Sequence, residues 1–361
     1  MKNKLLALIL ILLLTAATVS GCAAGTEAES NEATQEAASS GYEFPEAVLS
    51  DDGTTVTVID QAGREVTLPT EINSIVTNYP IAGNILIALG AVDKIVGVHS
   101  SAAESKVYQQ LAPQLCELPT IGSTGSMNIE SVMALNPDLA IVPVKWSGDI
   151  SKLDKAGIPY LVINPEGVDL LYETVALLGN ATGTADRARE FIGYYEEKRQ
   201  RMADFAAQNE EKTTVYLASH MDKLTAAGGG MIQSELIELA GGQMVTADSL
   251  SSGWSEVSME QVLEWNPQVI FTVQYANYDD NEFFTDEQWA NSDAVVNERV
   301  YRIPSYIDEW DTPVPASILG VMWMTSKLYP DVYSTEEMEA DALDYYQRFY
   351  GLQLTAEELG L

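Results

Sequence analysis

The chain has 361 residues, of which 53 are acidic and 19 are lysine or arginine, so its formal net charge is −34. This excess excludes a nucleic-acid partner, which requires clustered basic residues, and it disfavours a strongly anionic small ligand. With 46% hydrophobic residues the chain can bury a large core, and we expect two domains.

The N-terminus has the pattern of an export signal. Two lysines precede the apolar run Leu5–Leu14, and the small residues Val19–Gly21 lead to Cys22. Ten apolar residues are too few for a membrane-spanning helix but are typical of a signal-peptide core. The residues before Cys22 resemble a bacterial lipobox. We therefore expect residues 1–22 to be a lipoprotein signal peptide and Cys22 to be lipidated.

Residues 23–45 contain mostly Ala, Glu, Ser, Thr and Gln, so we expect a disordered tether between the lipid anchor and the folded part. The lipid would hold the protein on the outer, extracytoplasmic face of the cell membrane. Cys116 is then the one remaining thiol. Its apolar neighbour Leu115 favours a packed small hydrophobe over a nucleophile.

Strand and helix patterns alternate through residues 46–183, the expected N-terminal lobe. The predicted strands are a hairpin at Thr54–Ile59 and Glu65–Leu68, then Ser74–Asn78, Ile95–Val98, Leu139–Val142 and one that ends near Ile163. Helices are predicted at Ile81–Leu89, around Glu104–Leu111, and before the last strand. This alternation favours an α/β fold with a mostly parallel sheet that is covered on both faces.

The expected C-terminal lobe, residues 210–361, repeats this scheme. Its predicted strands are Thr213–Ala218, Val269–Val273 and Val300–Ile303, and its predicted helices include Ser234–Gly241 and Pro315–Leu328. Between the lobes, residues 184–209 place apolar side chains at helical spacing. We expect one long helix there, which joins two similar lobes.

One segment occurs twice. Met127–Ile141 and Val257–Phe271 share Glu, Val, Asn and Pro in register, and each copy begins a short helix with a glutamate, Glu130 or Glu260. A repeat with so long a period indicates two similar lobes rather than a solenoid of small units.

Several segments in this order resemble one protein family. They are Asp60–Val66, Ile87–Ala91, Leu118–Gly122, Ala134–Leu139 and Leu236–Gly242, within a similarity that extends from Val56 to about Asp331. The chain resembles the substrate-binding lipoproteins of ABC importers, in the class with a helical backbone that takes up ferric siderophores, haem and cobalamin. The resemblance implies a monomer that captures a metal chelate between its lobes and delivers it to a permease dimer, without a cofactor or metal of its own.

In that family one glutamate per lobe docks onto arginines of the permease, and Glu130 and Glu260 occupy the matching positions. The ligand is expected at the loops that follow the strands. These loops supply the predicted ligand-binding residues Asn78, Tyr79, His99, Lys145, Trp146, His220, Trp254, Tyr275, Tyr306, Glu309 and Trp310. Trp254 matches an aromatic residue in the cleft of the cobalamin-type members.

The identity of the ligand stays open at this level. Lys145, Lys223 and Arg302 are scattered candidates for cleft cations, which disfavours a catecholate or carboxylate siderophore and leaves hydroxamates, corrinoids and haem-like ligands. His99 and His220 are too few for a buried bare-metal site, although one of them is a candidate axial ligand to a chelated metal. The carboxylates of Asp308–Asp311 either meet a cationic ligand group or cap the following helix.

Two other function classes compete with import. An enzyme is disfavoured because the sequence has no Gly-x-Ser-x-Gly, His-Glu-x-x-His or phosphate-loop motif. A receptor that presents its ligand to a membrane sensor remains an alternative, as does a binder of another metal-containing solute.

Overall fold

The computed structural model describes residues 44–361 except 46, 209–210, 252 and 305. The predicted signal peptide, Cys22 and most of the predicted tether lie outside the described residues. Within the described part, no helix combines the length and the apolar character needed to cross a bilayer. The described residues belong to one compact unit, and the lobe boundaries predicted from the sequence stay predictions.

The N-terminal lobe contains a parallel sheet in the order β5-β4-β8-β9. Its strands are β4 (Ile75–Val76), β5 (Ile95–Gly97), β8 (Leu139–Pro143) and β9 (Tyr160–Ile163). Every residue of β8 and β9 is buried, as expected for strands that are covered on both faces. The helices of this lobe are α1 (Pro80–Ala88), α2 (Lys106–Leu111), α3 (Ile129–Leu135), α4 (Ser147–Ala156) and α5 (Val168–Thr182), with 3-10 turns at Val92–Lys94, Ala102–Glu104 and Pro113–Glu117.

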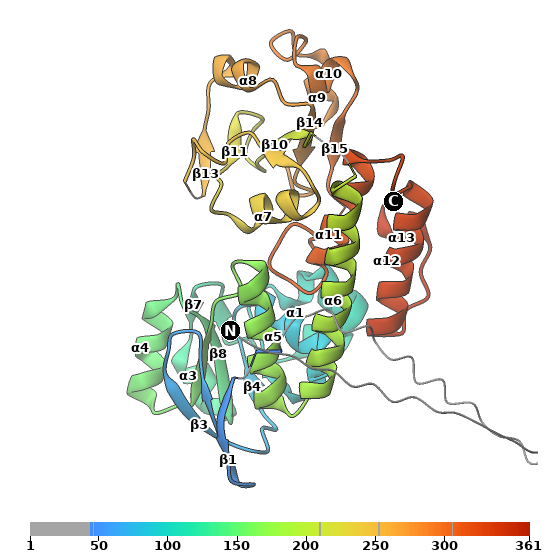
Figure 1. Cartoon of the computed structure of the whole chain (residues 1–361). Coiled ribbons are helices and arrows are strands. Elements are labelled where there is room, and N and C mark those ends of the chain that lie inside the picture. The colour runs from blue at the N-terminus through green and yellow to red at the C-terminus, as the bar shows by residue number, and fades with distance from the viewer. Residues whose placement is uncertain (1–43, 46, 209–210, 252, 305) are drawn as a thin grey trace, which may run out of the picture. The chain divides into compact units, whose positions relative to one another are not determined.

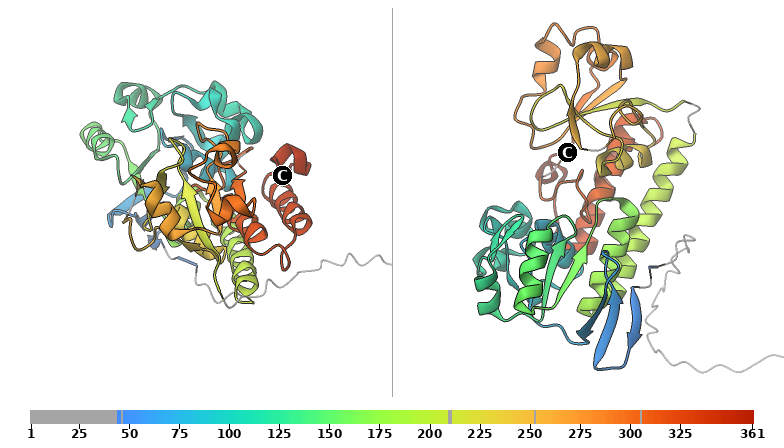
Figure 2. Two further views of the ribbon diagram at one scale, coloured as in Figure 1. Left: turned by 90° about the horizontal axis from the view of Figure 1, so that it is seen from above. Right: turned by 90° about the vertical axis from the view of Figure 1, so that its left-hand side faces the viewer.

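A separate antiparallel sheet precedes this lobe in the chain. It consists of β1 (Val48–Asp51), β2 (Thr55–Ile59) and β3 (Glu65–Pro69), and β2 and β3 form the predicted hairpin. Gln61, in the hairpin turn, donates from Nε2 to the Leu170 carbonyl at 2.9 Å and accepts at Oε1 from the Thr174 hydroxyl at 2.7 Å. The sheet therefore lies against α5 (Figure 2). The short strands β6 (Gly122–Ser123) and β7 (Ser126–Met127) pair with each other.

The C-terminal lobe has a mixed sheet in the order β13-β11-β10-β14-β15. Its strands are β10 (Thr214–Ala218), β11 (Thr225–Ala227), β12 (Gln243–Met244), β13 (Trp254–Glu256), β14 (Val269–Thr272) and β15 (Val300–Arg302). The pairs β10·β12, β10·β14 and β14·β15 are parallel, whereas β11 and β13 pair antiparallel. The helices are α7 (Ile232–Leu239), α8 (Met259–Trp265), α9 (Asn281–Thr285), α10 (Asp293–Val296), α11 (Ser317–Leu328), α12 (Thr335–Tyr350) and α13 (Ala356–Leu359). Two lobes with mostly parallel sheets confirm the predicted fold class.

The long helix α6 (Ala185–Ala206) follows α5 and leads into the C-terminal lobe (Figure 1). Its 22 residues span about 33 Å at 1.5 Å per residue. It packs against α5 and α11, and its cations reach α12, where Asp341 accepts from Lys198 at 2.9 Å and from Arg201 at 2.8 Å. Sequence reasoning did not identify α12, which lies beside α6.

The loop between β15 and α11 is packed tightly against α11 and α12. Trp310 is 1% exposed, and its Nε1 donates to the hydroxyl of Tyr346 in α12 at 3.3 Å. Gly320 of α11 lies against the backbone of Trp310, so closely that a Cβ atom at position 320 would overlap the Trp310 carbonyl oxygen. A side chain at position 320 would therefore push the loop away from α11.

Gly320→Ala is predicted to destabilise the protein by about 1–3 kcal/mol, the usual cost of overpacking a core, because backbone rather than a flexible side chain must move. Gly193→Ala is the matched control. Gly193 is an exposed residue inside α6 with open space where a Cβ would lie, so alanine there is predicted to stabilise by about 0.5–1 kcal/mol. Urea unfolding of the two variants measures both effects. Equal stabilities of the two variants would contradict the proposed packing.

Candidate functional site

A cavity of about 470 Å³ is lined by residues from both lobes. The residues that line it are Pro80, Ile81, Asn84, Glu104, Ser105, Lys106, Val107, Lys145, Glu166, Gln274, Ile307, Asp308, Glu309, Thr312, Pro313 and Val314. Several of them follow the carboxyl ends of β8, β9, β14 and β15, where open α/β sheets bind ligands. Of the predicted ligand-binding residues, Lys145 and Glu309 are on this lining.

A cluster of aromatic and charged side chains extends the N-terminal wall. Tyr79 donates from its hydroxyl to Glu166 at 3.3 Å, and Lys145 forms an ion pair with the same Glu166 oxygen at 2.6 Å. Trp146 packs edge-on against the Tyr79 ring, with 5.2 Å between the centroids. Burial, reinforced by the Glu166 charge, raises the pKa of the Tyr79 hydroxyl above its usual value. The predicted residues Tyr79, Lys145 and Trp146 are thus brought together around Glu166.

Two predicted ligand-binding residues of this lobe lie inside the protein instead. The Asn78 side chain is buried and donates to the Ser123 carbonyl at 3.0 Å and to Asp149 at 3.2 Å. His99 is buried beside the ring of Tyr108, and its Nδ1 lies 3.0 Å from the Ser101 hydroxyl. Burial lowers the pKa of His99. Neither side chain lines the cavity.

The C-terminal lobe supplies a second aromatic group. The His220 ring packs against Trp254 and against Tyr275, with centroid distances of 6.4 and 5.5 Å. The His220 Nδ1 atom is buried without a hydrogen-bond partner among the described residues. Tyr306 is exposed. The Lys106 ammonium nitrogen of the N-terminal lobe lies 5.5 Å from the centroid of its ring. His220, Trp254 and Tyr275 therefore cluster, whereas Tyr306 lies apart from them, and none of the four is part of the cavity lining.

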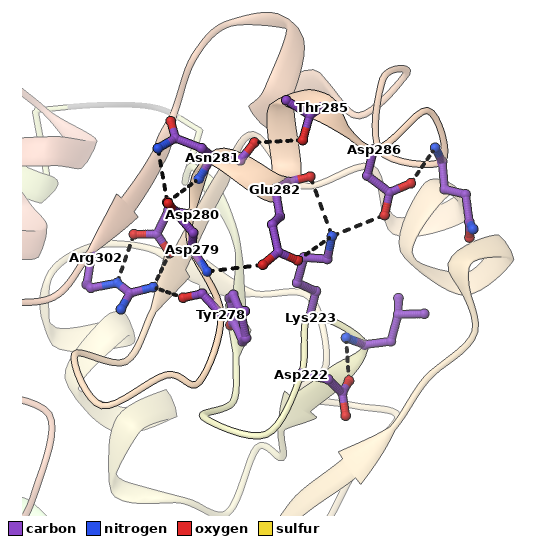
Figure 3. Close-up of polar contacts among 12 residues, drawn as sticks. Asp222, Lys223, Tyr278, Asp279, Asp280, Asn281, Glu282, Thr285, Asp286 and Arg302 are labelled. Atoms are coloured by element: carbon purple, nitrogen blue, oxygen red, sulfur yellow. Dashed lines mark hydrogen bonds and ion pairs between the residues drawn. The ribbon is translucent and has the colours of Figure 1, made fainter.

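The two basic candidates of the C-terminal lobe are engaged by carboxylates (Figure 3). Arg302 donates to both oxygens of Asp280, at 2.7 and 2.9 Å, and to the Tyr278 carbonyl at 2.7 Å. Lys223 pairs with Asp286 at 3.1 Å and lies 3.6 Å from Glu282. Neither cation lines the cavity, so neither provides it with positive charge.

The segment Asp308–Asp311, here called the acidic segment, bears three carboxylates between the lobes. Asp308 accepts from Asn84 of the N-terminal lobe at 3.3 Å. Burial and the Glu309 charge raise the pKa of Asp308 to about 7 and that of Asp311 also to about 7. Glu309 is exposed at the cavity wall. The loss of part of its hydration there raises the pKa of its carboxyl group. Trp310 points into the core rather than towards the cavity.

The two copies of the sequence repeat form matching structures. In α3 the Asn128 side chain accepts from the backbone of Glu130 at 3.1 Å, and in α8 the Ser258 side chain accepts from Gln261 at 3.2 Å. Both helices end at an asparagine in the left-handed conformation, with φ of 44° and 41°, directly before proline. Glu130 and Glu260 are both exposed, and neither side chain makes a hydrogen bond or ion pair with another described residue.

Sequence reasoning missed Asn84, Glu104, Lys106 and Glu166 as cavity residues. Glu166 follows β9 by three positions, so the rule that strand ends form the site would have found it. Asn84 lies within α1, and its position at the cavity depends on which face of that helix meets the other lobe. Among the residues that the structure describes, no group of three or more His, Cys, Asp or Glu side chains is placed to hold a metal ion.

Comparison with known proteins identifies the family. Residues 75–307 match the model of a family described as periplasmic binding protein. The molybdate-binding protein MolA of Haemophilus influenzae is 30% identical over 321 residues, which cover 81% of this chain and 90% of the relative. The vitamin B12-binding protein of Vibrio cholerae is 27% identical over 259 residues, 70% of this chain and 88% of the relative.

The fold has solved counterparts. The crystal structure of a periplasmic solute-binding protein from Veillonella parvula matches with a TM-score of 0.75 and 27% identity, over 84% of this chain and 95% of that one. MolA bound to molybdate, described as the cognate binding protein of an ABC transporter, matches with a TM-score of 0.72 and 28% identity, over 83% and 99% of the chains. The chain belongs to the periplasmic binding protein family, the extracytoplasmic, non-enzymatic substrate-binding proteins of ABC transporters.

Proposed function

We propose that this protein binds a metal chelate, of the hydroxamate, corrinoid or haem type, in the cavity between its lobes and delivers it to an ABC permease. The observation that carries the proposal is the cavity itself, whose lining residues follow strand ends in both lobes. Its volume of about 470 Å³ lies within the range of small-molecule sites and exceeds what a bare ion requires. Aromatic residues beside both walls suit a large, partly apolar ligand.

A second candidate ligand is an oxyanion such as molybdate. The relative MolA, at 30% identity, is a molybdate-binding protein. Lys106 and Lys145 supply two ammonium groups to the cavity lining, but Lys145 is already paired with Glu166. Since two carboxylates of the acidic segment, Asp308 and Glu309, share the same lining, the charge distribution favours the chelate over the oxyanion.

Delivery requires a docking surface, for which we propose the exposed faces of α3 and α8. A carboxylate in the first turn is favoured by the helix dipole and suits a charge-assisted pair with a permease arginine. An exposed apolar residue lies three positions after each glutamate, namely Met133, which is 57% exposed, and Leu263, which is 37% exposed. A charged group beside an exposed apolar side chain in both copies supports a protein partner with two similar halves, as in a permease dimer.

The ligand class is tested by titration with cyanocobalamin, haemin, a ferric hydroxamate, a ferric catecholate and molybdate, followed by tryptophan fluorescence. A chelate is predicted to bind more tightly than molybdate. Trp146→Ala and Trp254→Ala are each predicted to weaken its binding by about 1–3 kcal/mol, the scale for one large apolar side chain. Phe284→Ala is the control, because Phe284 is an exposed aromatic residue that belongs to neither the cavity lining nor the two aromatic groups around Tyr79 and His220. Tightest binding of molybdate would show that the chelate assignment is wrong.

Glu130→Ala and Glu260→Ala are predicted to leave ligand affinity unchanged and to impair uptake, most severely in combination. Their side chains lie outside the cavity and have no partner within the described residues. Uptake is measured in vesicles that contain the permease, and affinity is measured by calorimetry. Glu264→Ala is the matched control, because Glu264 is exposed on the same helix while its counterpart in the first copy is Ala134. A uniform loss of uptake in all three variants would argue against specific docking.

We also propose that lipid at Cys22 anchors the mature protein as a monomer on the outer face of the membrane. Cys22→Ser is predicted to move the protein into the soluble fraction, since residues 23–45 have no apolar segment that would retain it. Cell fractionation and immunoblotting measure the distribution. Retention of a processed Cys22→Ser variant in the membrane would disprove lipid anchoring.

A further inference from the structure

The cavity lining has an excess of negative charge. Four carboxylates, those of Glu104, Glu166, Asp308 and Glu309, accompany the ammonium groups of Lys106 and Lys145. Because Lys145 pairs with Glu166, the positive charge on the N-terminal wall is largely neutralised before any ligand arrives. The carboxylates of the acidic segment remain without a cation.

The acidic segment does not have the contacts of a structural motif. α11 begins at Ser317, its N-cap residue is Ala316, and no side chain caps it, so these acids do not serve as helix caps. Asp308 accepts from Asn84 and from the backbone of Glu309, both of which are neutral donors. The Glu309 side chain makes no hydrogen bond or ion pair with another described residue, although it lines the cavity.

The carboxylate of Asp311 is buried without a hydrogen-bond donor in the described part of the chain. Asp311 is 1% exposed, and neither of its carboxylate oxygens has a hydrogen-bond partner among the described residues. Buried acceptors in folded proteins are nearly always satisfied, so this unsatisfied carboxylate indicates a missing donor. Asp311 lies between Glu309 and Thr312 in the sequence, and both of these residues line the cavity.

We propose that the solute carries a positively charged, hydrogen-bond-donating group, such as an ammonium or guanidinium group, which binds Glu309 at the cavity wall and lies within the field of Asp308 and Asp311. This inference rests on the proposed function, because it specifies the charge of the chelate. The described acids do not converge as a metal site, so they recognise the organic part of the solute rather than a bare ion. A charge-assisted hydrogen bond of this kind selects a cationic solute over a neutral solute of the same shape.

The test uses chelates that differ in charge but share a metal centre. Ferric desferrioxamine B, with a free ammonium group, is compared with its N-acetylated form and with its N-succinylated form, which ends in a carboxylate. An aminoalkyl amide of cyanocobalamin, which carries a free ammonium group, is compared with cyanocobalamin and a cobalamin monocarboxylate, and molybdate is included. The best-bound member is predicted to be cationic, with the neutral form about ten- to hundredfold weaker. In Glu309→Gln this preference should largely disappear, whereas Glu287→Gln, an exposed residue of the same lobe outside the cavity, should retain it.

Each alternative result has a distinct meaning. Tightest binding of a neutral or anionic chelate would overturn the inference and leave the proposed chelate binding intact. A charge preference that persists in a folded Glu309→Gln variant, as verified by circular dichroism, would also overturn it. Binding of molybdate alone, or of no member of the series, would overturn both the inference and the proposed function.

Discussion

The packing of Trp310 between α11 and α12 is the constraint on which the arrangement of the site depends. The indole is buried and hydrogen-bonded to Tyr346, and Gly320 allows its backbone to lie directly on α11. Its neighbours in sequence, Asp308 and Glu309, are thereby held at the boundary between the lobes. A residue that was predicted to contact ligand instead positions the residues that line the cavity.

The burial of the carboxylates of the acidic segment has an electrostatic cost. In the folded state, burial raises the pKa values of Asp308 and Asp311 to about 7, from the ordinary aspartate value of 3.8. Because the folded-state values are raised, the protonated acids favour folding below about pH 4, and this contribution is lost as the pH rises towards 7. At neutral pH the site therefore retains partly ionised carboxylates that a cationic ligand group would stabilise. A positive charge placed beside these carboxylates would therefore offset the electrostatic cost of their burial.

The sequence predicted the features that depend on local pattern. Alternating strand and helix signals identified the parallel strands of both lobes except β12, and the repeat identified Glu130 and Glu260 as equivalent positions. The antiparallel strands β11 and β13 were missed because their sequences, Thr-Ala-Ala and Trp-Ser-Glu, lack the run of β-branched apolar residues that marks the predicted strands. The orientations of Trp310, Asn78 and His99 were not predictable either. Whether a loop side chain points into the core or the cavity depends on contacts with residues far away in sequence.

The matched ends of α3 and α8 have a consequence for the docking surface proposed above. Each glutamate is attached to a helix that is capped at its start and stopped by a left-handed asparagine, so it moves with its own lobe as a rigid body. The spacing between Glu130 and Glu260 then changes only when the lobes themselves move. In the proposed docking, the distance between the two glutamates reports the separation of the lobes, which helix α6 joins.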